Sequence, residues 1–115
     1  MEEQIDILLA SYNGKKYIEA QISSILNQTY KNIKLIISDD CSTDGTIDIL
    51  KKYAQKDNRI QLYLQEKNLG VVKNIEFLLK NVTNNLYMLS DQDDVWLPEK
   101  LKIGVDHLKK AERRP

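Results

Sequence analysis

The sequence predicts an α/β fold in which helices cover both faces of a mostly parallel, four-stranded sheet. Short apolar runs typical of buried strands alternate with segments whose apolar residues recur at helical spacing. Such alternation indicates right-handed βαβ crossovers, which place consecutive strands parallel. The chain has 115 residues, which suits a single domain over residues 1–115. Its 42% hydrophobic content, with only 2 Pro and 4 Gly, argues against disorder.

The first half of the chain contains two apolar runs, each followed by a helical pattern. Residues 5–10 and 33–37 are nearly continuous apolar runs, as in strands that are buried on both faces. Residues 15–27 predict a first helix, and Thr43 or Asp44 is expected to cap a second. The expected apolar faces are Tyr17, Ile18, Ala20, Ile22, Ile25 and Leu26 in the first helix, and Ile47, Ile49, Leu50, Tyr53 and Ala54 in the second.

The second half of the chain repeats this alternation. Residues 60–64 alternate apolar and polar side chains, which predicts a half-buried strand near an edge of the sheet. Residues 72–81 predict a third helix and residues 86–89 a fourth strand. Pro98 suits the first turn of a last helix that runs to about Ala111. The order β-α-β-α-β-α-β-α therefore predicts a Rossmann-like three-layer sandwich. The inward face of the third helix is expected to contain Ile75, Leu78 and Leu79.

Polar loops follow the predicted strands at the edge where open parallel sheets bind their ligands. The sharpest of these loops is Asp91-Gln92-Asp93-Asp94, after the fourth strand. In extended backbone Asp91 and Asp93 point the same way, roughly 6.6 Å apart, and would repel by about 2–3 kcal/mol at an effective dielectric near 20. A buried pair would therefore protonate or bind a cation, and oxygen ligands suit Mg²⁺ or Mn²⁺ on a diphosphate. The alternative is a solvated turn whose acids cap a helix.

Four further residues at this edge are candidates for nucleotide binding. Asp39 and Asp40 form a second acidic pair that could accept hydrogen bonds from a base or a ribose. The alternative for this pair is a capping turn rich in suitable residues. Lys73 could meet a phosphate or be a solvated helix residue, and Tyr12 could stack on a base or pack within its loop.

Charge, cysteine content and the ends of the chain exclude several classes of protein. The 17 Lys+Arg balance 17 Asp+Glu, and a formal net charge of zero argues against a nucleic-acid binder. The single cysteine, Cys41, excludes an internal disulfide framework. No signal peptide or membrane-spanning helix is visible, so we expect a cytoplasmic domain. The basic last helix is expected to be solvated, with peripheral contact to the inner face of a membrane as the alternative.

Five segments in a fixed order form the most specific feature of the sequence. They include the motifs Ser11-Tyr12-Asn13 and Asn68-Leu69-Gly70. Together the five segments resemble the nucleotide-sugar-binding portion of the family 2 glycosyltransferases, which have the A-type glycosyltransferase fold. The last of them is similar to that of many bacterial rhamnosyl- and related transferases that make surface polysaccharides. The five segments are residues 5–13, 22–30, 36–46, 68–70 and 90–98.

The resemblance implies a donor and a set of site residues. The donor would be a UDP- or dTDP-sugar, and the acceptor a glycan or a lipid-linked molecule. Asp40 would hydrogen-bond the base with Asp39 close by, and Asp93 would be the direct metal ligand of the family's D-x-D motif. The implied site residues are Ala10, Ser11, Tyr12, Asp39, Asp40 and Lys73 for the nucleotide, and Asp91 and Asp93 for Mg²⁺ or Mn²⁺.

The chain departs from the family in how few residues follow the D-x-D motif, and two other classes of protein stay open as alternatives. Family members carry the acceptor site and a catalytic base after the D-x-D motif, whereas only 21 residues follow Asp94 here. The resemblance therefore implies a truncated fold that is inactive alone, with the base C-terminal to this chain. The alternatives are a response-regulator receiver and a haloacid-dehalogenase-like phosphatase. A receiver needs an acidic pair where this chain has residues 11–13, and a phosphatase nucleophile loop would open the fold rather than begin at Asp91.

Overall fold

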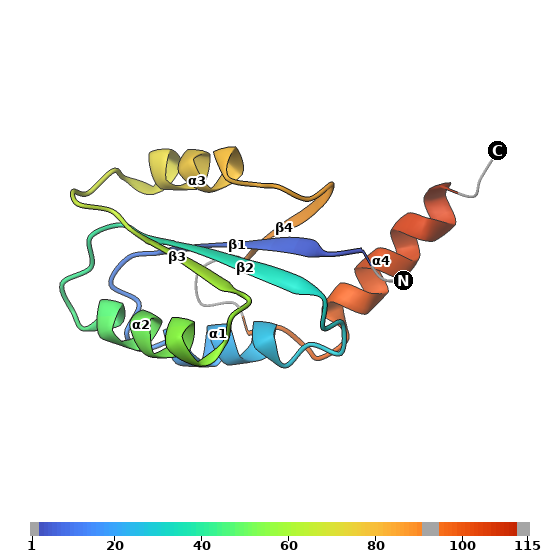
Figure 1. Ribbon diagram of the computed structural model, residues 1–115, viewed down its shortest axis with the longest axis horizontal. Helices are drawn as coiled ribbons and strands as arrows, with labels where there is room; N and C mark the ends of the chain where they lie inside the picture. Colours follow the sequence, from blue (N-terminus) through green and yellow to red (C-terminus); the bar gives the residue numbers. More distant parts are fainter. Residues whose placement is uncertain (1–2, 91–94, 113–115) are drawn as a thin grey trace.

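Strands and helices alternate through the chain in the predicted order (Figure 1). The computed structural model describes residues 3–90 and 95–112. No helix in these two stretches is both long enough and apolar enough to cross a membrane. The elements are β1 (Ile5–Ser11), α1 (Ile18–Leu26), β2 (Ile33–Asp39), α2 (Thr46–Lys56), β3 (Ile60–Leu64), α3 (Val71–Lys80), β4 (Leu86–Ser90) and α4 (Lys100–Glu112).

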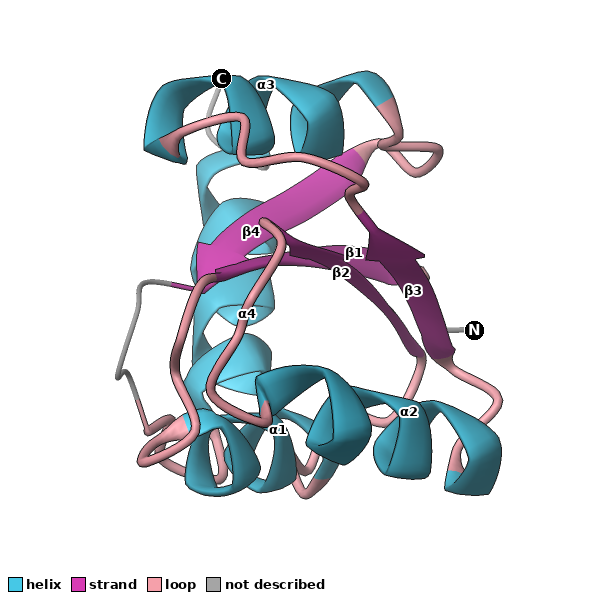
Figure 2. Cartoon of the chain, turned by 90° about the vertical axis from the view of Figure 1, so that its left-hand side faces the viewer, coloured by secondary structure: helices cyan, strands magenta, loops and turns pink. Residues whose placement is uncertain are grey.

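The four strands form one sheet in the order β3-β2-β1-β4, and every neighbouring pair is parallel. Ile5 of β1 pairs with Ile33 on one side and with Leu86 on the other. The chain moves outward from β1 to β3 and then returns to the far side of β1. Because the crossovers are right-handed, this reversal puts α1 and α2 on one face and α3 on the other (Figure 2). The predicted three-layer α/β/α sandwich is confirmed, and β3 lies at an edge as expected.

The core is divided into two parts by the sheet. Ile7 and Leu9 of β1 face the larger part, which α1, α2 and the start of α4 cover. Leu8 of β1 faces the smaller part under α3, together with Ile36 and Leu78. Each of these five side chains is fully buried, at 0% exposure, and contributes about 1.5–3 kcal/mol of hydrophobic stabilisation. Burial on both faces confirms the interpretation of the two continuous apolar runs.

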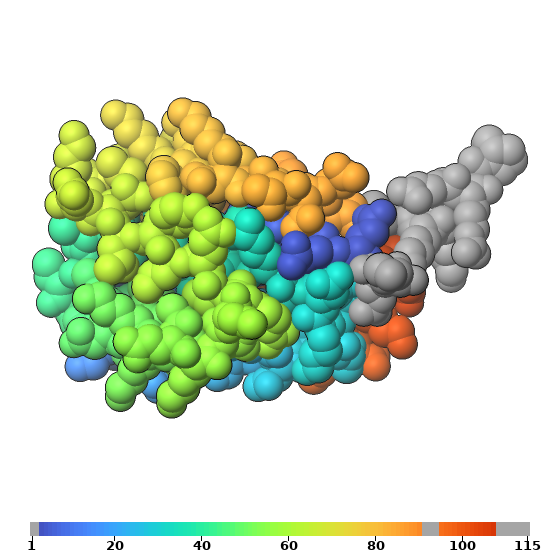
Figure 3. Space-filling model, in the orientation of Figure 1, coloured from blue at the N-terminus to red at the C-terminus, as the bar shows by residue number. Residues whose placement is uncertain are grey.

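The two outer layers lie on opposite sides of the molecular surface. In the space-filling view, α3 and β4 form the upper rim of the molecule, and α1 and α2 form the lower part (Figure 3). The start of α4 is attached through Leu101 and Val105, which are both buried in the larger core. Helix α4 therefore lies at the end away from the loops that follow β1 and β2, which leaves that edge open (Figure 1).

Two helix faces differ from the sequence prediction. Ala20 is exposed, and Tyr17 lies just before α1 at 45% exposure. In α3, Leu79 is 44% exposed, so its predicted inward position is wrong. Polar side chains take the buried positions instead, namely Gln21 in α1 and Asn74 in α3, each 2% exposed.

The helix starts also differ in detail from the prediction. Gly45, at φ +102°, precedes α2, and neither Thr43 nor Asp44 is the N-cap. Glycine suits this left-handed conformation because it has no Cβ. The Asp44 carboxylate still accepts the first helical amide, from Thr46, at 3.0 Å. Helix α4 begins at Lys100, so Pro98 lies in the preceding turn.

Candidate functional site

A cavity of about 290 Å³ opens at the carboxyl ends of the strands. It lies between β1 and β4, where the strand order reverses, and open α/β sheets bind ligands at this point. The walls come from the ends of β1, β2 and β4, and from the loop and first turn of α3. The lining residues are Ala10, Ser11, Tyr12, Asp40, Asn68, Gly70, Val71, Asn74, Ile75, Leu89 and Ser90.

Asp40 is the charged group in the cavity wall. It is 3% exposed, and its Oδ1 and Oδ2 accept hydrogen bonds from the backbone N–H groups of Leu69 at 2.6 Å and Gly70 at 3.0 Å. These bonds attach the loop before α3 to the end of β2. An ionised carboxylate can accept about four hydrogen bonds, so Asp40 keeps capacity for a donor on a ligand.

Asp39 points away from the cavity. Its side chain is fully buried and does not line the cavity wall. Oδ1 accepts hydrogen bonds from the Ser11 hydroxyl at 2.7 Å and the Ser42 hydroxyl at 2.6 Å, and Oδ2 accepts one from the Ser42 N–H at 2.9 Å. Neighbouring residues at a strand end face opposite sides, so the two acids of the pair have different surroundings. The structure brings only Asp40 to the cavity.

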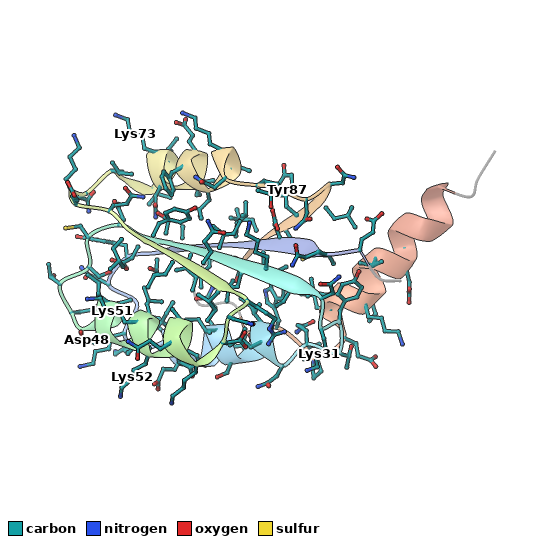
Figure 4. All side chains as sticks on the ribbon, in the orientation of Figure 1. Lys31, Asp48, Lys51, Lys52, Lys73 and Tyr87 are labelled. Atoms are coloured by element: carbon teal, nitrogen blue, oxygen red, sulfur yellow. The ribbon has the colours of Figure 1, made fainter. Side chains whose placement is uncertain are left out.

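Asn74, which lines the cavity, forms a buried polar pair with Ser38 of β2. The Ser38 hydroxyl donates to Asn74 Oδ1 at 2.6 Å, and Asn74 Nδ2 donates to the Ser38 carbonyl at 3.0 Å. Gln65 Nε2 also donates to the Ser38 hydroxyl at 3.0 Å. The sequence interpretation selected Lys73 rather than Asn74, but Lys73 is exposed, lies outside the cavity lining and points outward from α3 (Figure 4).

The remaining predicted residues, Ala10, Ser11 and Tyr12, all line the cavity. Tyr12 is 47% exposed, so its ring is available to a ligand. Apolar side chains of Val71 and Leu89 lie in the same lining. A carboxylate acceptor, an exposed aromatic ring and apolar walls together suit a flat heterocycle that carries an N–H donor.

Polar side chains of α1 and of Gln28, two residues after its end, hold both flanks of the acidic segment 91–94, and the sequence analysis did not select them. Gln21 Nε2 donates to the hydroxyl of Ser90, immediately before this segment, at 3.0 Å. The hydroxyl of Ser24 accepts a hydrogen bond from the N–H of Trp96 at 2.9 Å. Gln28 donates from Nε2 to the Leu97 carbonyl at 2.7 Å, and its Oε1 accepts from the Leu101 N–H at 3.1 Å.

The predicted metal ligands, Asp91 and Asp93, lie outside the described residues. Within residues 3–90 and 95–112, no three side chains of His, Cys, Asp or Glu gather in a way that could hold a metal ion. The metal site therefore stays a prediction from the sequence.

The family model of glycosyl transferase family 2 matches residues 6–114. This chain belongs to glycosyl transferase family 2. The match excludes the receiver and the phosphatase as alternatives. A curated relative from Bacillus subtilis, TuaG, is named as a teichuronic acid biosynthesis glycosyltransferase and is 37% identical over 104 residues. That alignment covers 90% of this chain and 41% of TuaG, so this family 2 domain spans about two fifths of the length of that relative.

Solved structures agree with this assignment. The crystal structure of Staphylococcus aureus TarS 1–349 in complex with UDP-GlcNAc has a TM-score of 0.85 and 28% identity, and covers 95% of this chain and 32% of that one. The mannosyltransferase PcManGT from Pyrobaculum calidifontis, in complex with GDP-Man and Mn²⁺, has a TM-score of 0.75 at 21% identity. It covers 84% of this chain and 29% of its own, and this likeness shows the fold.

Proposed function

We propose that this family 2 domain binds the nucleotide-diphosphate sugar donor of a glycosyltransferase that builds a bacterial surface polysaccharide. The observation that carries the proposal is the cavity at the strand reversal, with the Asp40 carboxylate in its wall and the exposed Tyr12 ring in its lining. The similarity to TarS, solved with UDP-GlcNAc, supports a UDP-sugar as the donor, with a dTDP-sugar as the second candidate.

The proposed recognition uses the contacts of the cavity directly. The Asp40 carboxylate accepts the ring N–H of uracil or thymine, and a charge-assisted hydrogen bond of this kind contributes about 1.5–3 kcal/mol. The ring of Tyr12 stacks on the base, which contributes about 1–3 kcal/mol. Asn68 and the first turn of α3 then lie beside the ribose and the diphosphate. A role for Lys73 at the diphosphate stays a prediction, because its side chain lies on the outer face of α3.

A divalent cation is part of this proposal. Asp91 and Asp93 would hold Mg²⁺ or Mn²⁺, and such an ion neutralises the charge that develops on a departing diphosphate. The presence of Mn²⁺ in PcManGT supports the use of such an ion in this fold. The glycan or lipid-linked acceptor, the catalytic base outside these residues and the location at the inner face of the membrane also stay predictions.

Isothermal titration calorimetry with UDP and dTDP tests the proposal. We expect the wild-type chain to bind UDP or dTDP only when Mn²⁺ or Mg²⁺ is present. Asp40→Asn should weaken that binding at least about tenfold, because the amide is a weaker acceptor than the carboxylate. The matched control is Asp48→Asn, which removes an exposed carboxylate of α2 and should change the affinity less than about twofold.

Each part of the proposal has its own contrary result. Failure of the wild type to bind any nucleoside diphosphate would refute donor binding. Equal affinity for the nucleotide in Asp40→Asn and in the wild type would refute binding of the base in this cavity. Metal-independent binding that is unchanged in Asp93→Asn would refute the role of the cation.

A further inference from the structure

We propose that Asp39 is a positioning residue for base recognition, holding the loop that carries Tyr12 without contacting the nucleotide. This inference rests on the proposed function. It gives separate roles to two adjacent acids: Asp40 lines the cavity, whereas Asp39 is fully buried and does not.

The Asp39 carboxylate joins the loop after β1 to the loop after β2. Oδ1 accepts the hydroxyl hydrogens of both Ser11 and Ser42, and Oδ2 accepts the Ser42 N–H. The Ser11 carbonyl in turn accepts the Asp40 N–H at 2.9 Å. Ser11 is therefore fixed through its side chain and its carbonyl, which sets the position of the next residue, Tyr12.

Asn13, which follows Tyr12, is also attached to the loop after β2. The N–H of Asn13 donates to the Ser42 hydroxyl oxygen at 2.8 Å, and Asn13 Oδ1 accepts the Thr43 N–H at 2.8 Å. Asn13 has a φ of +48°, a left-handed conformation that asparagine tolerates better than most residues. Both neighbours of Tyr12 are thus attached to the loop after β2, directly or through Ser42.

This arrangement has a consequence for selectivity rather than for stability alone. A base is recognised when the Tyr12 ring and the Asp40 carboxylate keep a fixed separation and angle. Through Ser11 and Ser42, the Asp39 carboxylate links the segments that carry Tyr12 and Asp40. Loosening this link lets the ring and the carboxylate move independently. Preorganised groups discriminate between ligands better than mobile ones, because no ordering cost opposes the correct fit.

The chain supplies a matched control in Asp6. It is also a fully buried carboxylate of the sheet, and it accepts backbone N–H bonds from Thr83 at 2.7 Å and Asn84 at 3.1 Å. Asn84 Nδ2 donates to it as well, at 2.6 Å. Asp6 lies near the start of β1, at the edge opposite the cavity. Asp6→Asn and Asp39→Asn therefore disturb the fold in comparable ways at opposite ends of the sheet.

The experiment measures the dissociation constants of UDP and GDP with Mn²⁺, and unfolding in urea, for the wild type and both variants. We expect the wild type to prefer UDP. Asp39→Asn should lose about tenfold in UDP affinity while GDP binding changes little, so that the preference shrinks. Asp6→Asn should lose comparable stability and keep the wild-type preference. If Asp39→Asn does not fold, Ser42→Ala serves as the second variant, because it removes the hydroxyl that joins the Asp39 carboxylate to the Asn13 N–H.

The results that would overturn the role of Asp39 differ from the result that would refute donor binding. An unchanged UDP preference in a folded Asp39→Asn or Ser42→Ala variant overturns the inference, as does an equal loss of preference in Asp6→Asn. A wild type that binds UDP and GDP equally also overturns it. A wild type that binds neither nucleotide refutes the proposed function itself.

Discussion

Replacing Gln28 with alanine removes the side chain that attaches the end of α1 to the start of α4. The amide of Gln28 is 0% exposed and makes three hydrogen bonds. Nε2 donates to the carbonyls of Ser24 at 3.0 Å and Leu97 at 2.7 Å, and Oε1 accepts the Leu101 N–H at 3.1 Å. The Leu101 N–H belongs to the first turn of α4, where no carbonyl of the helix itself is available.

The size of the loss follows from what the substitution leaves unpaired. The Leu101 N–H loses this partner, whereas the Leu97 carbonyl keeps the N–H of Lys100 at 3.1 Å. A buried polar group without a partner costs about 1–3 kcal/mol, so we expect Gln28→Ala to lower the free energy of unfolding by about 2 kcal/mol. With a urea m-value of about 1.5 kcal/mol/M, the unfolding midpoint would fall by about 1.3 M.

Urea unfolding followed by circular dichroism measures this change, with Gln55→Ala as the control. Gln55 is exposed on α2, so its replacement by alanine should change stability by less than about 0.5 kcal/mol. A loss below about 1 kcal/mol for Gln28→Ala would refute the reasoning, because it would show that water or a neighbouring group replaces the amide at little cost.

Two further predictions concern the core and the pH dependence of stability. Leu78→Ala should lower the free energy of unfolding by about 3 kcal/mol, whereas its neighbour Leu79→Ala, at 44% exposure, should cost less than about 1 kcal/mol; similar losses in urea unfolding would contradict the assigned face of α3. Hydrogen bonds from Arg59 lower the pKa of Asp57 below its ordinary 3.8. The stabilisation that Asp57 contributes is therefore complete above a pH of 3.8 and is lost as the pH falls through the lowered pKa. Asp57→Asn should therefore be less stable than the wild type at about pH 7, and this difference should shrink at about pH 2; a difference that grows on acidification would contradict the sign.

The sequence predicted the order and type of every element because the apolar periodicity carried that information. The continuous runs of β1 and β2 predicted central strands, and the alternation in β3 predicted an edge. The same reasoning failed where burial depends on a distant partner. Gln21 and Gln28 have polar side chains and look solvent-facing, yet their partners lie 69 to 73 residues away in the sequence. No local pattern contains that information.

The candidate site shows the same limit at the level of single residues. The acids directly follow the predicted strands, which predicted their position at the carboxyl edge of the sheet. Asp40 and Tyr12 do line one cavity there. Which acid of the pair faces the cavity depends on the direction of its side chain, and the family resemblance, rather than the residue types, selected Asp40. Lys73 was selected for its charge, whereas the α3 face turned toward the sheet presents Asn74, whose role needed the buried partner Ser38 to become visible.

The most direct test of donor binding is a titration of the isotopically labelled chain with UDP in the presence of Mg²⁺, followed by amide chemical shifts. We expect the amides of Leu69 and Gly70, which donate to Asp40, to shift together with those of residues 10–12. Shifts confined to the cavity formed by Thr29, residues 95–100 and Ile103 would contradict it. So would an unchanged spectrum at saturating UDP.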